Sequence, residues 1–167
     1  IVEGLKTIAK PIDILINNAG VMRRGTMLES SEEDFDILFN VNVKGSWLML
    51  KHTVPHLSEG AMVVQMASRY SLELSVDPGL YALTKATDMC LADLFKETCP
   101  ECTVKTLFVG PVDTPLARHA VEGEALERKK KIMHTTDDVA DLICELMESD
   151  KTRLVYRLKS RDYVMEQ

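Results

Sequence analysis

Residues 11–20 read PIDILINNAG, an apolar run placed between a proline and a tetrapeptide typical of turns. Ile12–Ile16 has the length of a buried strand, and Asn17–Gly20 favours a turn directly after it. Comparable apolar runs follow at Ala61–Ala67, Thr103–Val109 and Thr152–Leu158. These runs predict strands that each end in a loop.

Segments with helical periodicity lie between the strands. One helix is expected to begin at Ser30–Ser31, which can cap it ahead of an acidic first turn. It should extend to about Leu57, with Pro55 disturbing or ending it. A longer helix spans roughly Leu80–Glu97, and another runs from Thr135 through Leu146.

The remaining segments are a helix tail over residues 1–9, a loop over Ser68–Gly79 and a charged connection over 115–131. Alternating strands and helices are the pattern of βα units around a parallel sheet. We therefore predict a single α/β domain over residues 1–167, with a Rossmann-like, doubly wound and mostly parallel sheet.

Composition limits the classes of partner. The formal net charge of −6 gives no electrostatic reason to expect a nucleic acid. No apolar run approaches the ~20 residues that a membrane-spanning helix needs, so no membrane is expected. A chain of 167 residues can bury a core without disulfides, so the cysteines are expected to be reduced thiols in a cytoplasmic protein.

Two pairs of residues have the spacing of metal ligands. Cys99 and Cys102 enclose two residues, but zinc needs two more ligands and the chain has no second such pair, which favours a plain loop. His52 and His56 lack an acidic partner and are expected to be exposed. No metal is predicted.

The sequence Tyr81-Ala-Leu-Thr-Lys85 places a phenol and an ammonium on one face of the predicted long helix. A free tyrosine has a pKa of about 10, and a neighbouring ammonium favours the phenolate. The pair suits proton transfer to an alcohol or carbonyl oxygen, although the same spacing occurs on ordinary amphipathic helices.

Other polar segments are expected to meet this pair. In a doubly wound sheet the ligand lies outside the carboxyl ends of the strands, where Asn17–Gly20, Ser68 and Gly110–Thr114 fall. Together with Asn42 in NVNVKG (40–45), these motifs follow the order and spacing of one family. From about Asp13 to Thr114 the sequence resembles the short-chain dehydrogenase/reductases.

The resemblance implies a catalytic set. Tyr81 would be the general acid in reduction and the general base in oxidation, and Ser68 would orient the substrate oxygen. Lys85 would lower the pKa of Tyr81 and hold the nicotinamide ribose, while Asn42 would hold a water that links Lys85 to solvent. The substrate would be a small-molecule secondary alcohol or ketone, set largely by the segment Pro115–Lys131.

The resemblance also implies NAD or NADP as the cofactor, and a homodimer or homotetramer built partly from the helix that carries Tyr81. Asn18, Ala19 and Gly20 would lie along the adenosine side of the cofactor, and Val112 and Thr114 would meet the nicotinamide carboxamide.

Each position also has a purely structural alternative. Asn18 could cap a turn, Asn42 could bond the backbone, Ser68 could be an ordinary turn residue, and Thr114 could cap the next helix.

The chain departs from the family at its front. No glycine-rich turn follows a first strand, so we expect the sheet to lack its first βαβ units and residue 1 to begin partway into a longer protein. This chain alone is therefore expected to bind NAD or NADP poorly. The alternatives are an extended-type relative, a sugar-nucleotide epimerase or dehydratase, and a non-catalytic cofactor-binding or inactive fragment.

Overall fold

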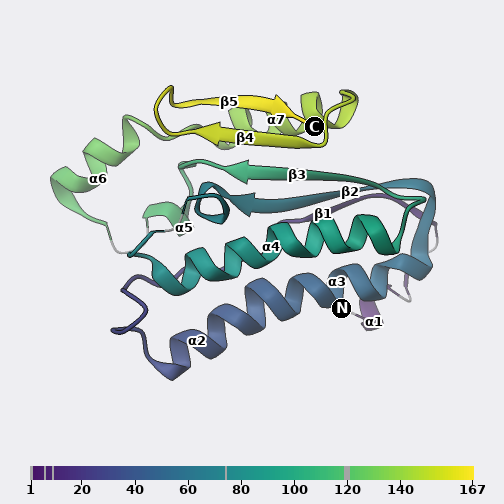
Figure 1. Ribbon diagram of the computed structural model, residues 1–167, viewed down its shortest axis with the longest axis horizontal. Coiled ribbons are helices and arrows are strands. Elements are labelled where there is room, and N and C mark those ends of the chain that lie inside the picture. Colours follow the sequence, from purple (N-terminus) through teal and green to yellow (C-terminus); the bar gives the residue numbers. More distant parts are fainter. Residues whose placement is uncertain (1, 6, 9, 74, 119–120) are drawn as a thin grey trace.

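A computed structural model describes residues 2–5, 7–8, 10–73, 75–118 and 121–167 (Figure 1). Its sheet has five strands in the order β1-β2-β3-β4-β5. Their bounds are β1 Ile12–Asn17, β2 Leu57–Ser68, β3 Thr103–Val109, β4 Arg153–Arg157 and β5 Asp162–Glu166. The first four are parallel and β5 is antiparallel to β4, which confirms the mostly parallel α/β sheet.

Helices connect the parallel strands. They are α1 Val2–Leu5, α2 Glu32–Leu38, α3 Ser46–Thr53, α4 Gly79–Thr98, α5 Pro115–Arg118, α6 Gly123–Lys130 and α7 Thr136–Glu148. Shorter 3-10 turns are η2 Val54–His56 and η3 Arg69–Ser71, and a π-helical segment, η1 Phe39–Gly45, joins α2 to α3. The three longer predicted helices are confirmed, and Pro55 lies in the 3-10 turn that ends the first of them. The helix tail expected over residues 1–9 is helical at Val2–Leu5, while residues 1, 6 and 9 lie outside the described residues.

Local sequence explains where two of the helices begin. Ser31 accepts a hydrogen bond from the Asp34 backbone, and the Asp34 side chain bonds the Ser31 backbone in return. Thr135 and Asp138 form the same reciprocal box ahead of α7. Such boxes satisfy backbone donors that a helix start otherwise leaves open, so these residues set the two boundaries.

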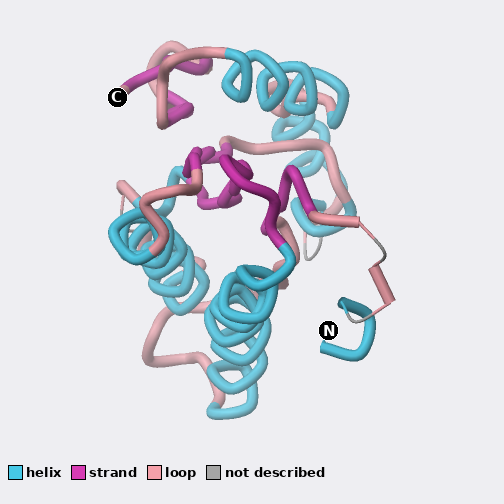
Figure 2. Tube along the Cα trace, turned by 90° about the vertical axis from the view of Figure 1, so that its right-hand side faces the viewer, coloured by secondary structure: helices cyan, strands magenta, loops and turns pink. Residues whose placement is uncertain are grey.

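Two layers of helices cover the middle of the sheet (Figure 2). On one face, Val63 and Val104 pack against Ala92 and Phe95 of α4 and Leu50 of α3. On the other face, Val64, Leu107 and Leu154 pack against Val139 and Leu146 of α7. Because β2 and β3 are covered on both faces, they form the rigid centre of the fold.

Two expectations for the strands were wrong. Ile12–Ile16 was expected to be buried, but Ile14 is 47% and Ile16 48% exposed. The reason is that β1 is an edge strand whose outer face no described element covers. The strand β5 was not expected at all, because its pairing with β4 depends on a tight return at 158–161 that the apolar pattern does not mark.

Candidate active site

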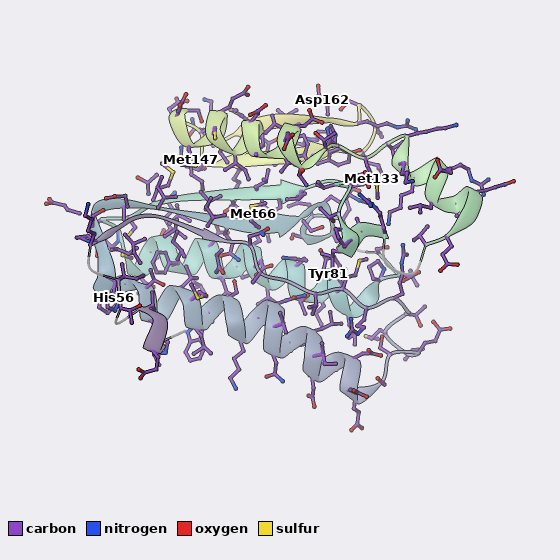
Figure 3. The ribbon with its side chains drawn as sticks, turned by 180° about the vertical axis from the view of Figure 1, so that it is seen from behind. His56, Met66, Tyr81, Met133, Met147 and Asp162 are labelled. Carbon is purple, nitrogen blue, oxygen red and sulfur yellow. The ribbon has the colours of Figure 1, made fainter. Side chains whose placement is uncertain are left out.

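The carboxyl ends of β1, β2 and β3 converge on one cavity of about 500 Å³. Most of the predicted site residues form part of its wall: Asn18, Gly20, Ser68, Tyr81, Lys85, Val112 and Thr114. Figure 3 shows Tyr81 on α4 and Met133 after α6 at the same end of the molecule. Ala19 is exposed and lies outside this wall, and Asn42 lies behind it.

Ser68 and Tyr81 meet inside the cavity. Ser68 is the last residue of β2, and its hydroxyl caps the turn η3 by accepting a hydrogen bond from the Tyr70 backbone at 3.3 Å. Tyr81 is buried in the first turns of α4, and its phenol interacts with the Ser68 side chain. The strand end and the helix start thus bring two hydroxyls to one point.

Burial raises the pKa of Tyr81 above its ordinary value, while the hydrogen bond with Ser68 acts in the lowering direction. The charge of Asp88 adds to the increase. The resemblance implied that Lys85 would lower this pKa. In the structure burial outweighs the favourable contacts, so the pKa is raised and the phenol is held in its protonated form. The lowering effect of Lys85 stays a prediction.

Lys85 has a carboxylate partner that the sequence analysis missed. Its Nζ donates to Asp88 Oδ2 at 2.7 Å and to the Met66 carbonyl at 2.9 Å, and both charged residues are buried. Burial raises the pKa of the Asp88 carboxyl, and the contact with Lys85 acts against this increase. Asp88 stands three residues after Lys85 and seven after Tyr81, so helical spacing alone could have found it.

A buried chain of polar side chains continues from Asp88 through the layer between helices and sheet. Gln65 Nε2 donates to Asp88 Oδ1 at 3.0 Å and to Ser46 Oγ at 2.8 Å. Asn17 Nδ2 in turn donates to Ser46 Oγ at 2.8 Å and to Gln65 Oε1 at 2.9 Å. The network joins β1, β2, α3 and α4, so it fixes the helix that carries Tyr81 relative to the sheet.

Asn42 is buried in the π-helical segment η1, a type of irregularity that is frequent at functional sites. Its amide accepts from the Val21 backbone at 2.8 Å, donates to the Val21 carbonyl at 2.9 Å and donates to Thr84 Oγ1 at 3.0 Å. These bonds hold the turn after β1 against α4. Backbone bonding, the structural alternative for Asn42, is therefore present, and the water relay stays a prediction.

Gly20 lies on the cavity wall beside Lys85. A Cβ on Gly20 would stand 3.4 Å from Asn42 Oδ1 and 3.8 Å from Lys85 Nζ. Two other residues of the wall have structural partners: Val112 forms a bridge with His134, and Thr114 Oγ1 accepts from the Ala117 backbone at 3.3 Å as the cap of α5. Thr114 thus has the capping role while it also lines the cavity.

The two pairs with metal-like spacing lie elsewhere. The Cys99 and Cys102 sulfurs are 2.8 Å apart inside the core between α4 and β3, and burial raises the pKa of the Cys99 thiol to about 12. His52 and His56 were expected to be exposed but are half-buried. Among the described residues, no three His, Cys, Asp or Glu side chains are grouped to hold a metal, and no helix is long and apolar enough to cross a membrane.

Known proteins are similar to this chain in sequence and in fold. Residues 1–155 match the family described as enoyl-(acyl carrier protein) reductase. Oxidoreductase UcpA of Salmonella typhimurium is 38% identical over 116 residues, which cover 64% of this chain and 42% of UcpA. Dehydrogenase/reductase SDR family member 6 of Aquarana catesbeiana is 31% identical over 172 residues, covering 92% of this chain and 69% of the relative.

Among solved structures, angucycline C-6 ketoreductase LanV with bound NADP has a TM-score of 0.75 to this chain at 26% identity. The match covers 89% of this chain and 61% of LanV. The chain thus spans less than two thirds of the length of UcpA and of LanV. With the family match, the parallel sheet and the grouped Ser68, Tyr81 and Lys85, the chain belongs to the short-chain dehydrogenase/reductase family.

Proposed function

We propose that this chain forms the catalytic part of an NAD(P)-dependent oxidoreductase that interconverts a secondary alcohol and a ketone. The observation that carries the proposal is the grouping of the Ser68 hydroxyl, the Tyr81 phenol and the Lys85 ammonium on the wall of one cavity. LanV, a ketoreductase of similar fold, binds NADP, which supports both the cofactor and the carbonyl substrate.

The residues around Gly20 fit a dinucleotide. The glycine leaves the backbone open to a ligand beside Lys85, and the ammonium there can donate hydrogen bonds to ribose hydroxyls. Val112 and Thr114 lie on the same cavity wall and would meet the nicotinamide end, with Asn18 on the adenosine side. The bound cofactor supplies the hydride, and the protein supplies orientation and the proton.

Ser68 and Tyr81 act on the substrate oxygen. The Ser68 hydroxyl can hydrogen-bond a carbonyl oxygen while the Tyr81 phenol donates its proton to that oxygen as charge develops there. A raised pKa keeps Tyr81 protonated, which suits it to be the acid of the reduction. In the oxidation direction, Tyr81 must lose its proton, and the positive charge of Lys85 then favours the phenolate.

The test is Tyr81→Phe in the complete natural polypeptide, with Tyr156→Phe as a control at a buried tyrosine outside the cavity wall. The phenyl ring keeps the packing and removes the proton. We expect kcat to fall by about 10²–10⁴-fold while NADPH affinity is retained, and the control to keep its activity. More than about a tenth of wild-type kcat in Tyr81→Phe would contradict the role of Tyr81.

We also propose that the protein is a homodimer or homotetramer in which α4 contributes to the contact. Leu83 and Leu94 lie three helical turns apart on α4, and they are 46% and 65% exposed. Exposed leucines on one side of the helix that carries Tyr81 fit a second copy of the chain. Light scattering on the complete polypeptide gives the molar mass that checks this.

A further inference from the structure

The cavity carries a charge opposite to that of the protein as a whole. The chain has a formal net charge of −6, yet the described wall of the cavity includes Arg24, Arg69, Lys85 and Lys129 and no aspartate or glutamate. Lys85 forms an ion pair with Asp88, which lies behind the wall, so its charge is partly balanced there. Three cations from separate parts of the chain therefore face the cavity next to the proposed proton donor.

Arg69 places its charge directly beside the catalytic residues. It follows Ser68 in the sequence, its guanidinium carbon lies 4.2 Å from the centre of the Tyr70 ring, and its Nη2 donates to the Tyr70 hydroxyl at 2.8 Å. The Tyr70 ring in turn meets the Tyr81 ring edge-on, with centroids 6.1 Å apart. A group bound by Arg69 would thus lie close to the phenol of Tyr81.

Lys129 approaches from α6, on the segment that the sequence analysis associated with the substrate. Its Nζ donates to the Ala117 carbonyl, and within the described part of the chain no carboxylate forms an ion pair with it. Burial, followed by the charges of Arg24 and Arg69, lowers the pKa of Lys129. Arg24 and Arg69 thus repel Lys129 across the cavity wall that all three residues line, which costs free energy that a bound anion would offset.

The acidic partners of Arg24 and Arg69 do not cancel the excess of positive charge at the cavity. Arg24 pairs with Asp77 at 3.2 Å and Arg69 with Glu73 at 3.9 Å, and these acids are 46% and 58% exposed. Exposed ion pairs are weakened by water and salt. Both acids also lie outside the cavity wall, so they do not place negative charge where a ligand would bind.

The rest of the wall on this side is apolar, with Met22, Pro78, Leu116 and Ile132 among its residues. We infer that the substrate is an anionic carbonyl compound, an oxo acid with an apolar body, whose carboxylate binds between Arg24, Arg69 and Lys129 while its carbonyl meets Ser68 and Tyr81. This inference rests on the proposed function. The same cations could instead bind a phosphate of the cofactor, and the experiment separates the two sources.

The test compares oxo acids of about five to eight carbons with their methyl esters, using NADPH and the complete natural polypeptide. We expect kcat/KM to be at least about tenfold higher for the acids, mainly through KM. In Lys129→Met and in Arg69→Met, the acid-to-ester ratio of kcat/KM should fall by about tenfold. Lys131→Met, an exposed lysine next to the same helix and outside the wall, should keep the wild-type ratio.

An unchanged acid-to-ester ratio in both variants would overturn the inference. A rise in the KM for NADPH without a change in that ratio would also overturn it, because the cations would then bind the cofactor. If no pair of compounds is turned over, the proposed function fails while the anion site remains testable by thermal unfolding. A rise in Tm with the acids but not the esters, lost in Lys129→Met, would support the site, and equal Tm values would refute it.

Discussion

Tyr81 and Lys85 lie one helical turn apart on α4, yet different neighbours determine the state of each. Tyr81 is surrounded by apolar groups and Ser68, so its phenol stays protonated. Lys85 is held by Asp88 and by the Met66 carbonyl. At the scale of single residues, the four-residue spacing along the helix identifies Tyr81 and Lys85 as a pair. The negative charge of Asp88 then offsets the effect of the Lys85 charge on the pKa of Tyr81.

Replacing Asp88 with asparagine tests this influence. The charge of Asp88 raises the pKa of Tyr81, so Asp88→Asn should lower that pKa, and the rising limb of kcat/KM for alcohol oxidation should move to lower pH. Lys85→Met removes a positive charge and should move the same limb to higher pH, with a loss of cofactor affinity. Lys96→Met, an exposed change on the same helix, serves as the control.

Urea unfolding of the Asp88 and Lys85 variants shows whether each remains folded, because both residues are buried. Shifts in opposite directions are the result that a purely structural ion pair does not produce. Identical pH profiles in wild type and folded Asp88→Asn would mean that Asp88 has no influence on Tyr81.

At the scale of elements, the site depends on how β3 ends against the hairpin of β4 and β5. Gly110 follows β3, and its backbone N–H donates to the Tyr163 hydroxyl at 3.1 Å. A Cβ on Gly110 would stand only 2.4 Å from the Tyr156 ring. Close approach of the backbone to a buried aromatic ring therefore requires glycine at this position, directly before the segment with Val112 and Thr114.

We expect Gly110→Ala to lower the free energy of unfolding by about 1–3 kcal/mol, because an added methyl group has to displace a buried ring. Gly4→Ala is the matched control, since a Cβ on Gly4 meets nothing within 4 Å. Urea unfolding of both variants measures the difference. A Gly110→Ala protein as stable as the control would show that the hairpin moves away at no cost.

At the scale of the whole molecule, burial of tyrosines links stability to pH. Burial raises the pKa of Tyr163 to about 12, and burial also raises that of Tyr81. In the unfolded chain both phenols ionise near pH 10. A raised folded-state pKa contributes stability that is fully present below that pH and is lost as the pH rises through the folded-state value.

We therefore expect the midpoint of urea unfolding to fall steeply between about pH 10 and 12. In Tyr163→Phe the fall should be shallower, because one of the two linked ionisations is removed. Phenolate absorbance should appear together with unfolding. Full ionisation of Tyr163 in a protein that is still folded would contradict the expected linkage.

The amino-acid sequence by itself determined the features that arise from neighbours a few residues apart. Strand and helix periods predicted the α/β order, and the possible caps at Ser30–Ser31 and the start at Thr135 marked two helix starts. The Tyr81 and Lys85 spacing placed both side chains on one helix face. These patterns are local, so they can be read without knowing how the chain packs.

The tertiary structure alone decided which distant groups meet. It paired Asp88 with Gln65 across two elements, left Ile14 and Ile16 exposed on an edge strand, and brought Arg24 near Lys129 in one cavity. Burial and charge at such points depend on contacts between residues far apart in the chain. A sequence pattern reports the neighbours along the chain, whereas the pKa of Tyr81 and the charge of the cavity depend on neighbours in space.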